Sequence, residues 1–76
     1  MNNYEETIKL IAQNIKRIRI AKGLSVQEVA YRCDIERSNL SRLEAGRTNM
    51  TIKTLCLICS ALNVEIVDLL SKKSRL

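Results

Sequence analysis

The chain has 76 residues, a length that predicts a single domain, residues 1–76. Aromatic residues make up only 3% of it, proline is absent, two glycines occur, and Leu, Ile, Val and Ala supply nearly all of the apolar side chains. This composition favours an all-α fold over a β-sheet, which usually carries more aromatic residues and turn glycines. Lysine and arginine outnumber acidic residues by 13 to 8, and the resulting net charge of +5 suits a polyanionic partner.

The sequence also argues against several classes of protein. No apolar run approaches the roughly 18–20 residues that cross a bilayer, and the N-terminus lacks the apolar core of a signal peptide. We therefore expect a cytoplasmic, nucleoid-associated protein with no membrane partner. Histidine is absent, and no serine, cysteine or acid pair stands in a catalytic pattern, so we do not expect an enzyme. No cofactor or small-molecule ligand is indicated.

Three cysteines occur, and two of them, Cys56 and Cys59, have the C-x-x-C spacing of metal and redox sites. Structural zinc sites need four nitrogen or sulfur ligands, and this chain offers no histidine and no second cysteine pair. The pair also lies in an apolar helical run, where cysteine packs as a small hydrophobic residue. We therefore interpret the pair as packing residues and expect no metal; a redox role is the alternative.

Apolar residues recur every three or four positions from residue 5 to residue 22. This spacing predicts an amphipathic helix over 5–22, which Gly23 ends. Its predicted buried stripe consists of Ile8, Ile11, Ala12, Ile15 and Ile18. Its expected solvated face carries Lys9, Lys16, Arg17 and Arg19.

Two short helices are predicted next. Ser25 and Glu28 form a capping-box pattern that starts a helix over 26–33, and Asp34 tolerates the left-handed backbone of a tight corner. The following helix, 37–45, ends at Gly46. The residues expected to face the core are Val29, Ala30, Cys33, Ile35, Leu40 and Leu43.

The remaining chain predicts two more helices and a tail. Thr51 can cap a helix over 52–62 that Asn63 ends, and a short helix follows over 65–70. Residues 71–76 read as a polar, basic tail that frays. The result is a compact all-α domain of five helices.

The predicted helices within 26–45 meet the requirements of a helix-turn-helix, which presents its second helix to a DNA groove. Ala30 is small enough to let the second helix approach, and Leu40 and Leu43 face inward. The segments Leu24–Ala30 and Ile35–Gly46 resemble the Xre-type (phage repressor and Cro-like) helix-turn-helix family. Within it, the chain looks most like the controller proteins of restriction–modification systems.

The resemblance implies a lambda-repressor-like fold and a regulator that binds double-stranded DNA. The residues at its base-contacting positions are Arg37, Ser38, Asn39 and Arg42. Those at its phosphate-contacting positions are Gln27, Ser41, Arg47, Asn49 and Lys53. Glu44 is usually structural in such proteins, bonding the local backbone or an arginine of the first helix. The family commonly has glutamine where this chain has Val26, so either Gln27 replaces that contact or the contact is absent.

The fourth predicted helix is apolar around most of its circumference, and such a helix is usually buried on both sides. A second copy of the chain would supply the second partner, which agrees with dimerisation of similar proteins through 52–70. The expected interface residues are Leu57, Ala61, Val64 and Val67. The alternative is an apolar surface without a partner.

For the function, the alternatives are an ordinary solvated face at Arg37 and Arg42, or an antitoxin-type protein-interaction module of the same fold.

Overall fold

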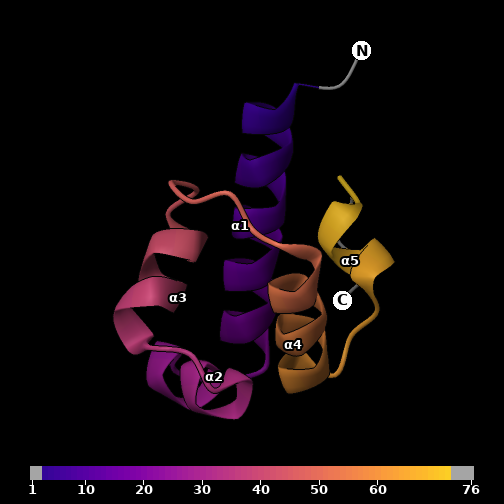
Figure 1. The fold of residues 1–76 in the computed structure, drawn as a ribbon. Coiled ribbons are helices and arrows are strands. Elements are labelled where there is room, and N and C mark those ends of the chain that lie inside the picture. Colours follow the sequence, from indigo (N-terminus) through magenta and orange to yellow (C-terminus); the bar gives the residue numbers. More distant parts are fainter. Residues whose placement is uncertain (1–2, 73–76) are drawn as a thin grey trace.

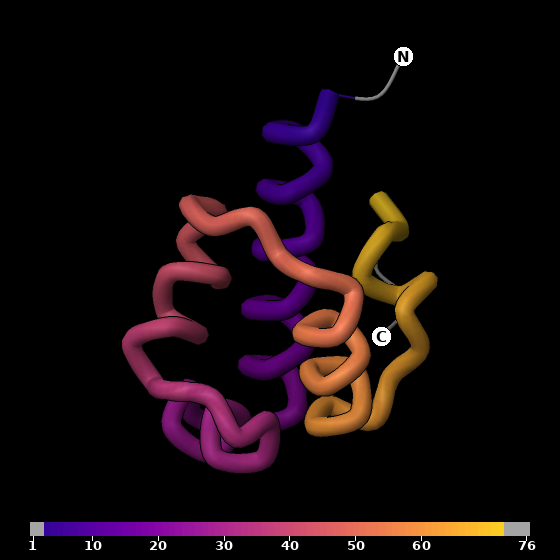
Figure 2. Tube along the Cα trace, viewed as in Figure 1, coloured from indigo at the N-terminus to yellow at the C-terminus, as the bar shows by residue number. Residues whose placement is uncertain are grey.

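The computed structural model describes residues 3–72. Within that range the chain forms five helices and no strand, which confirms the all-α prediction. The helices are α1 (Tyr4–Ala21), α2 (Val26–Cys33), α3 (Arg37–Glu44), α4 (Ile52–Leu62) and α5 (Ile66–Leu70). The long α1 stands in the middle, with α3 on one side and α4 and α5 on the other, while α2 closes one end (Figure 1). The tube in Figure 2 shows the extended segment after α3 crossing in front of α1 to reach α4.

Local signals set most of the helix ends. The Ser25 hydroxyl accepts from the Glu28 backbone N–H, and the Glu28 carboxylate accepts from the Ser25 N–H. That backbone hydrogen bond is the main reason why the pKa of the Glu28 carboxyl lies below its usual value. Thr51 caps α4 in a similar way, and Asp34 and Asn63 end α2 and α4 with left-handed backbones. The predicted bounds of α2 and α4 are confirmed; those of α3 and α5 differ by one residue at one end, and those of α1 by one residue at each end.

One hydrophobic core joins all five helices. Its largest fully buried side chains are Ile15, Ile18, Leu40, Ile58, Leu62 and Leu69. Two polar residues of α1 are buried with them, Asn14 and Arg19. The prediction that Arg19 and Arg17 lie on a solvated face is therefore wrong: Arg19 pairs with a carboxylate, and the half-buried Arg17 donates a hydrogen bond to Asn14.

The end of α5 is tied to α1. The Ser71 carbonyl accepts a hydrogen bond from Asn14, so the predicted fraying does not begin at Ser71. The rest of the predicted basic tail, residues 73–76, lies outside the described residues. No helix in residues 3–72 combines the length and the apolar character needed to cross a membrane.

Candidate nucleic-acid interface

A tight turn sets α3 against α2. Asp34 has φ 58° and donates its backbone N–H to the Tyr31 carbonyl, while the N–H of Ile35 reaches the Ala30 carbonyl. Ala30 is buried where the helices meet, as predicted from its small side chain. The predicted left-handed corner is also confirmed. The geometry is that of a helix-turn-helix, in which the second helix is available to a groove.

A buried ion pair fixes α3 to α1. Arg19 donates from Nε to Glu44 Oε2 over 2.6 Å and from Nη2 to Oε1 over 3.0 Å. Its Nη1 donates to the carbonyl of Leu24, in the segment before α2, over 2.8 Å. The two charged side chains are only 11% and 7% exposed. One guanidinium thus ties together α1, the end of α3 and the start of α2, and the expected structural role of Glu44 is confirmed. Such a pair defines geometry more than it adds net stability.

The predicted base-contacting residues share the outer face of α3. Arg37, Ser38 and Arg42 are exposed, and Asn39 is half-buried, while Leu40 and Leu43 point into the core. The first turn of α3 contains no acidic residue, and its N-cap residue Glu36 makes no side-chain cap. The positive end of the helix dipole therefore adds to the arginine charges on this face, a combination that favours an anion.

The predicted phosphate-contacting residues surround that face. All five are exposed: Gln27 near the start of α2, Ser41 on α3, Arg47 and Asn49 in the loop after α3, and Lys53 near the start of α4. Gln27 lies on the helix that precedes α3, and Arg47, Asn49 and Lys53 lie on the loop and helix that follow it. A groove-bound α3 would therefore bring polar groups from both of its neighbours to the nucleic-acid backbone.

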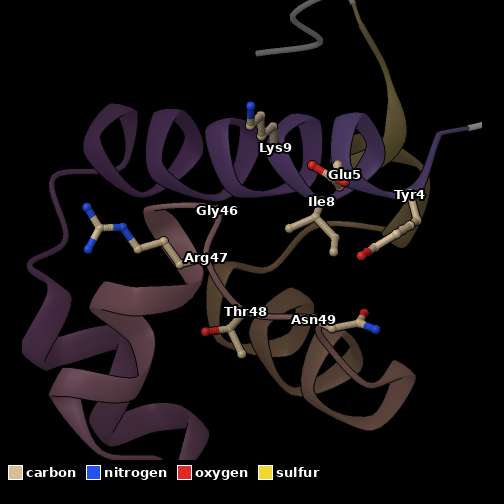
Figure 3. Close-up of a pocket in the computed structure, with 8 residues that line it drawn as sticks. All are labelled: Tyr4, Glu5, Ile8, Lys9, Gly46, Arg47, Thr48 and Asn49. Carbon is tan, nitrogen blue, oxygen red and sulfur yellow. The ribbon is translucent and has the colours of Figure 1, made fainter.

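The loop after α3 borders the N-terminal half of α1. Arg47 and Asn49 line a hollow together with Tyr4, Glu5 and Lys9 of α1. In Figure 3 the Arg47 side chain extends away from Tyr4 and Glu5, so its guanidinium remains open to an external anion. The acidic Glu5 makes the inner end of this hollow a poor place for a phosphate.

Val26 and Gln27 occupy the position where similar proteins commonly have glutamine and the position after it. Val26 is half-buried and packs against the core. Gln27, one position later, is exposed. The side chain at the expected position is thus a packing residue, and Gln27 is the amide of α2 that is free to face solvent.

Helices α4 and α5 expose several apolar side chains, among them two of the four predicted interface residues. Leu57 is 37% exposed and Val67 50% exposed, as an interface role requires. The other two offer less surface, because Ala61 is 9% exposed within the monomer and Val64 is half-buried against the core. Ala61 lies where α4 meets α2, and its carbonyl accepts from Arg32.

Sequence reasoning missed three exposed apolar residues on the same two helices: Ile52, Ile66 and Leu70. These three line one apolar hollow between α1, α4 and α5. The four-residue spacing of Ile66 and Leu70 places them on one side of α5. That spacing is visible in the sequence and could have indicated these two residues.

Comparison with known proteins agrees with the helix-turn-helix geometry of α2 and α3. A protein-family model described as Helix-turn-helix matches residues 15–69, which include α2 and α3. This chain belongs to that helix-turn-helix family. The resemblance expected from Leu24–Ala30 and Ile35–Gly46 is thereby confirmed.

Relatives of this helix-turn-helix protein include regulators. It is 41% identical over 63 residues to the uncharacterized HTH-type transcriptional regulator y4dJ of Sinorhizobium fredii, covering 83% of this chain and 82% of that protein. It is 34% identical over 62 residues to control protein C.BamHI of Bacillus amyloliquefaciens, covering 80% and 76%. The crystal structure of the restriction–modification controller protein C.AhdI from Aeromonas hydrophila matches with a TM-score of 0.79 at 27% identity, covering 82% of this chain and 94% of that one.

The cysteines of this helix-turn-helix protein divide between core and surface. Cys33 and Cys59 are buried, and burial raises the pKa of both thiols. The packing interpretation is confirmed for Cys59 and is wrong for Cys56, which is exposed. In the described part of the chain, no three His, Cys, Asp or Glu side chains gather as a metal site.

Proposed function

We propose that this helix-turn-helix protein is a transcriptional regulator that binds double-stranded DNA sequence-specifically as a homodimer. The observation that supports this most is the exposed face of α3, where Arg37, Ser38 and Arg42 stand opposite the buried Leu40 and Leu43. The ion pair between α1 and α3 holds that face in a fixed orientation. A rigid helix with donors on its outer side suits the major groove, which presents a distinct pattern of hydrogen-bonding groups for each base pair.

The proposed contacts fall into two classes. Arg37, Ser38, Asn39 and Arg42 contact base edges and select the sequence, and an arginine paired bidentately with guanine contributes about 1–3 kcal/mol of discrimination. The phosphate contacts set the register of the protein on DNA and make its affinity depend on salt. They come from Gln27, Ser41, Arg47, Asn49 and Lys53.

The exposed apolar residues of α4 and α5 support the homodimer. We assign the interface to Leu57 and Val67 with Ile66 and Leu70, which are the exposed apolar residues, and leave out Ala61 and Val64, which are buried or half-buried within the monomer. A two-fold axis there would place the two copies of α3 about 34 Å apart, one turn of B-DNA. The operator would then be an inverted repeat, bound in the cytoplasm where the nucleoid lies.

Two of the relatives named above are described as a transcriptional regulator and a control protein. These descriptions agree with a role that involves no catalysis. A DNA-binding role also needs no cofactor and no metal. The chain lacks histidine, and burial raises the pKa of two of its three cysteine thiols. We therefore assign the protein a non-enzymatic role with DNA as its partner.

Selection from random duplex DNA tests the proposal. We expect the wild-type protein to enrich one inverted repeat, and fluorescence anisotropy to show about ten- to a hundredfold weaker binding of that repeat by Arg37→Ala. Lys72→Ala removes the same charge just after α5 and serves as the control. The proposal fails if no sequence is enriched, or if Arg37→Ala and Lys72→Ala bind the enriched repeat equally well.

A further inference from the structure

Asn14 is a buried polar residue that takes no part in the proposed DNA interface. It lies on α1, is 6% exposed, and uses both halves of its amide. Its Nδ2 donates to the Leu69 carbonyl over 2.8 Å and to the Ser71 carbonyl over 2.9 Å, and its Oδ1 accepts from Arg17 Nη2 over 3.0 Å. The bond from Arg17 fixes which side of the amide is turned towards the two carbonyls.

The element that Asn14 holds has little stability of its own. Helix α5 has five residues, far fewer than an isolated helix needs in water. Within α5 only Leu69 is buried. The last carbonyls of a helix have no partner inside it and need donors from elsewhere. Asn14 supplies two such donors at the end of α5, where the helix lies beside α1 (Figure 1).

Three exposed apolar residues lie on this short helix: Ile66, Val67 and Leu70. When α5 leaves α1, these side chains lose their common orientation. A protein whose binding-competent state is only partly populated binds more weakly by that fraction. In a homodimer both copies must be competent, so the apparent dissociation constant rises with the inverse square of the docked fraction.

We propose that Asn14 is a positioning residue that keeps α5 docked against α1 and so presents the dimerisation surface. The proposal rests on the homodimer proposed above. Helix α1 then contributes to dimerisation indirectly. Asn14 binds the carbonyl groups at the end of α5 and does not itself contact the second copy. Hydrogen bonds at one end of the domain then control how well two copies of α3 can bind one operator.

The variant Asn14→Leu tests this, because leucine has the same branched shape and number of heavy atoms and no donor. We expect its dimer dissociation constant, measured by sedimentation equilibrium, to rise about ten- to a hundredfold, as expected when buried carbonyls lose their donors. Hydrogen exchange should speed up at the amides of α5 and remain slow in α2 and α3. Asn14→Ser, whose single hydroxyl can satisfy one carbonyl at most, should raise the dimer dissociation constant less. This variant replaces Asn14→Leu in the comparison with wild type if Asn14→Leu does not fold.

Ile18→Val is the matched control. Ile18 lies on the same helix, is buried, and makes no contact through a polar group, so its truncation lowers stability without touching the carbonyls of α5. We expect Ile18→Val to leave the dimer constant within threefold of wild type, about the precision of such a measurement. The proposal is overturned if the Asn14 variants dimerise as tightly as wild type, or no more weakly than Ile18→Val. A monomeric wild-type protein would instead contradict the homodimer itself.

Discussion

The exposed face of α3 and the exposed faces of α4 and α5 differ in chemistry, although all three helices bury the same kind of aliphatic side chain. Outside the core, α3 carries Arg37, Ser38 and Arg42, whereas α5 carries Val67 and Leu70. A charged, hydrogen-bonding face suits a hydrated polyanion, and a contiguous apolar face suits a dry contact with protein. One small core thus supports two surfaces of different chemistry, for which we propose separate partners.

The two regions are also fixed to α1 by different chemistry. The end of α3 is held by a buried ion pair, Arg19 with Glu44, and the end of α5 by the neutral amide of Asn14. Breaking a buried ion pair leaves an uncompensated charge, which is more unfavourable than leaving neutral carbonyls without donors. Loss of the ion pair should therefore destabilise the helix-turn-helix more than loss of the Asn14 amide destabilises α5.

The largest expected effect follows from Arg19→Ala, which leaves the Glu44 carboxylate buried and unpaired. We expect a loss of about 3–5 kcal/mol in the free energy of unfolding, measured by urea titration with circular dichroism. The control Lys16→Ala removes an exposed charge from the same helix and should change the stability by less than about 0.5 kcal/mol. Equal urea midpoints for the two variants would show that the pair does not hold α3.

The next effect concerns the apolar region. Val67→Glu places a charge on the proposed dimer surface, where Val67 is half exposed, so the monomer should fold normally. We expect the dimer dissociation constant to rise at least about thirtyfold, the effect of disrupting an interface hot spot, as measured by sedimentation equilibrium. Ile20→Glu introduces the same charge at an exposed apolar position of α1 and should leave the dimer intact. If both variants dimerise equally, the surface of α5 is not the interface.

A third variant, Arg42→Ala, tests the polar region. On the preferred operator we expect a loss of about 1–3 kcal/mol in binding, and relaxed selectivity at one base pair of each half-site. Anisotropy titrations against operators with single base-pair changes measure both. A loss of the same size on every sequence would assign Arg42 to a phosphate instead of a base.

The smallest effect is expected for Lys53→Ala. Lys53 is exposed at the start of α4, outside the recognition helix α3, and we assign it to a phosphate. Binding should weaken by a similar factor on every sequence, and the slope of log affinity against log salt should decrease in magnitude by about 1 for each copy of the protein. An unchanged slope would show that Lys53 does not contact a phosphate.

Local sequence signals predicted the helices and the turn well. The bounds of α2 and α4 follow from side chains within three or four residues of each end, such as the Ser25 cap and the left-handed Asp34. The outer face of α3 follows from the spacing of Leu40 and Leu43, because the positions between them must point outward. Such features depend on neighbours in the chain, which the sequence displays directly.

Features that depend on distant partners were not predictable in this way. Arg19 meets Glu44 across 25 positions, and Asn14 meets Leu69 across 55, so the sequence around α1 presents both residues as ordinary polar positions. The same limit explains Ala61: an apolar residue on α4 faces either α2 or solvent, and only the packing of the helices decides which. The burial of Ala61 and Val64 within the monomer was for this reason not predictable from the sequence.

The most direct test of the central claim varies the DNA instead of the protein. The selected inverted repeat is compared with one whose half-sites are moved apart by five base pairs, about half a helical turn, which places them on opposite sides of the duplex. A homodimer that inserts two copies of α3 should bind the altered repeat no better than a single half-site in anisotropy titrations. Equal affinity for the two repeats would contradict the account.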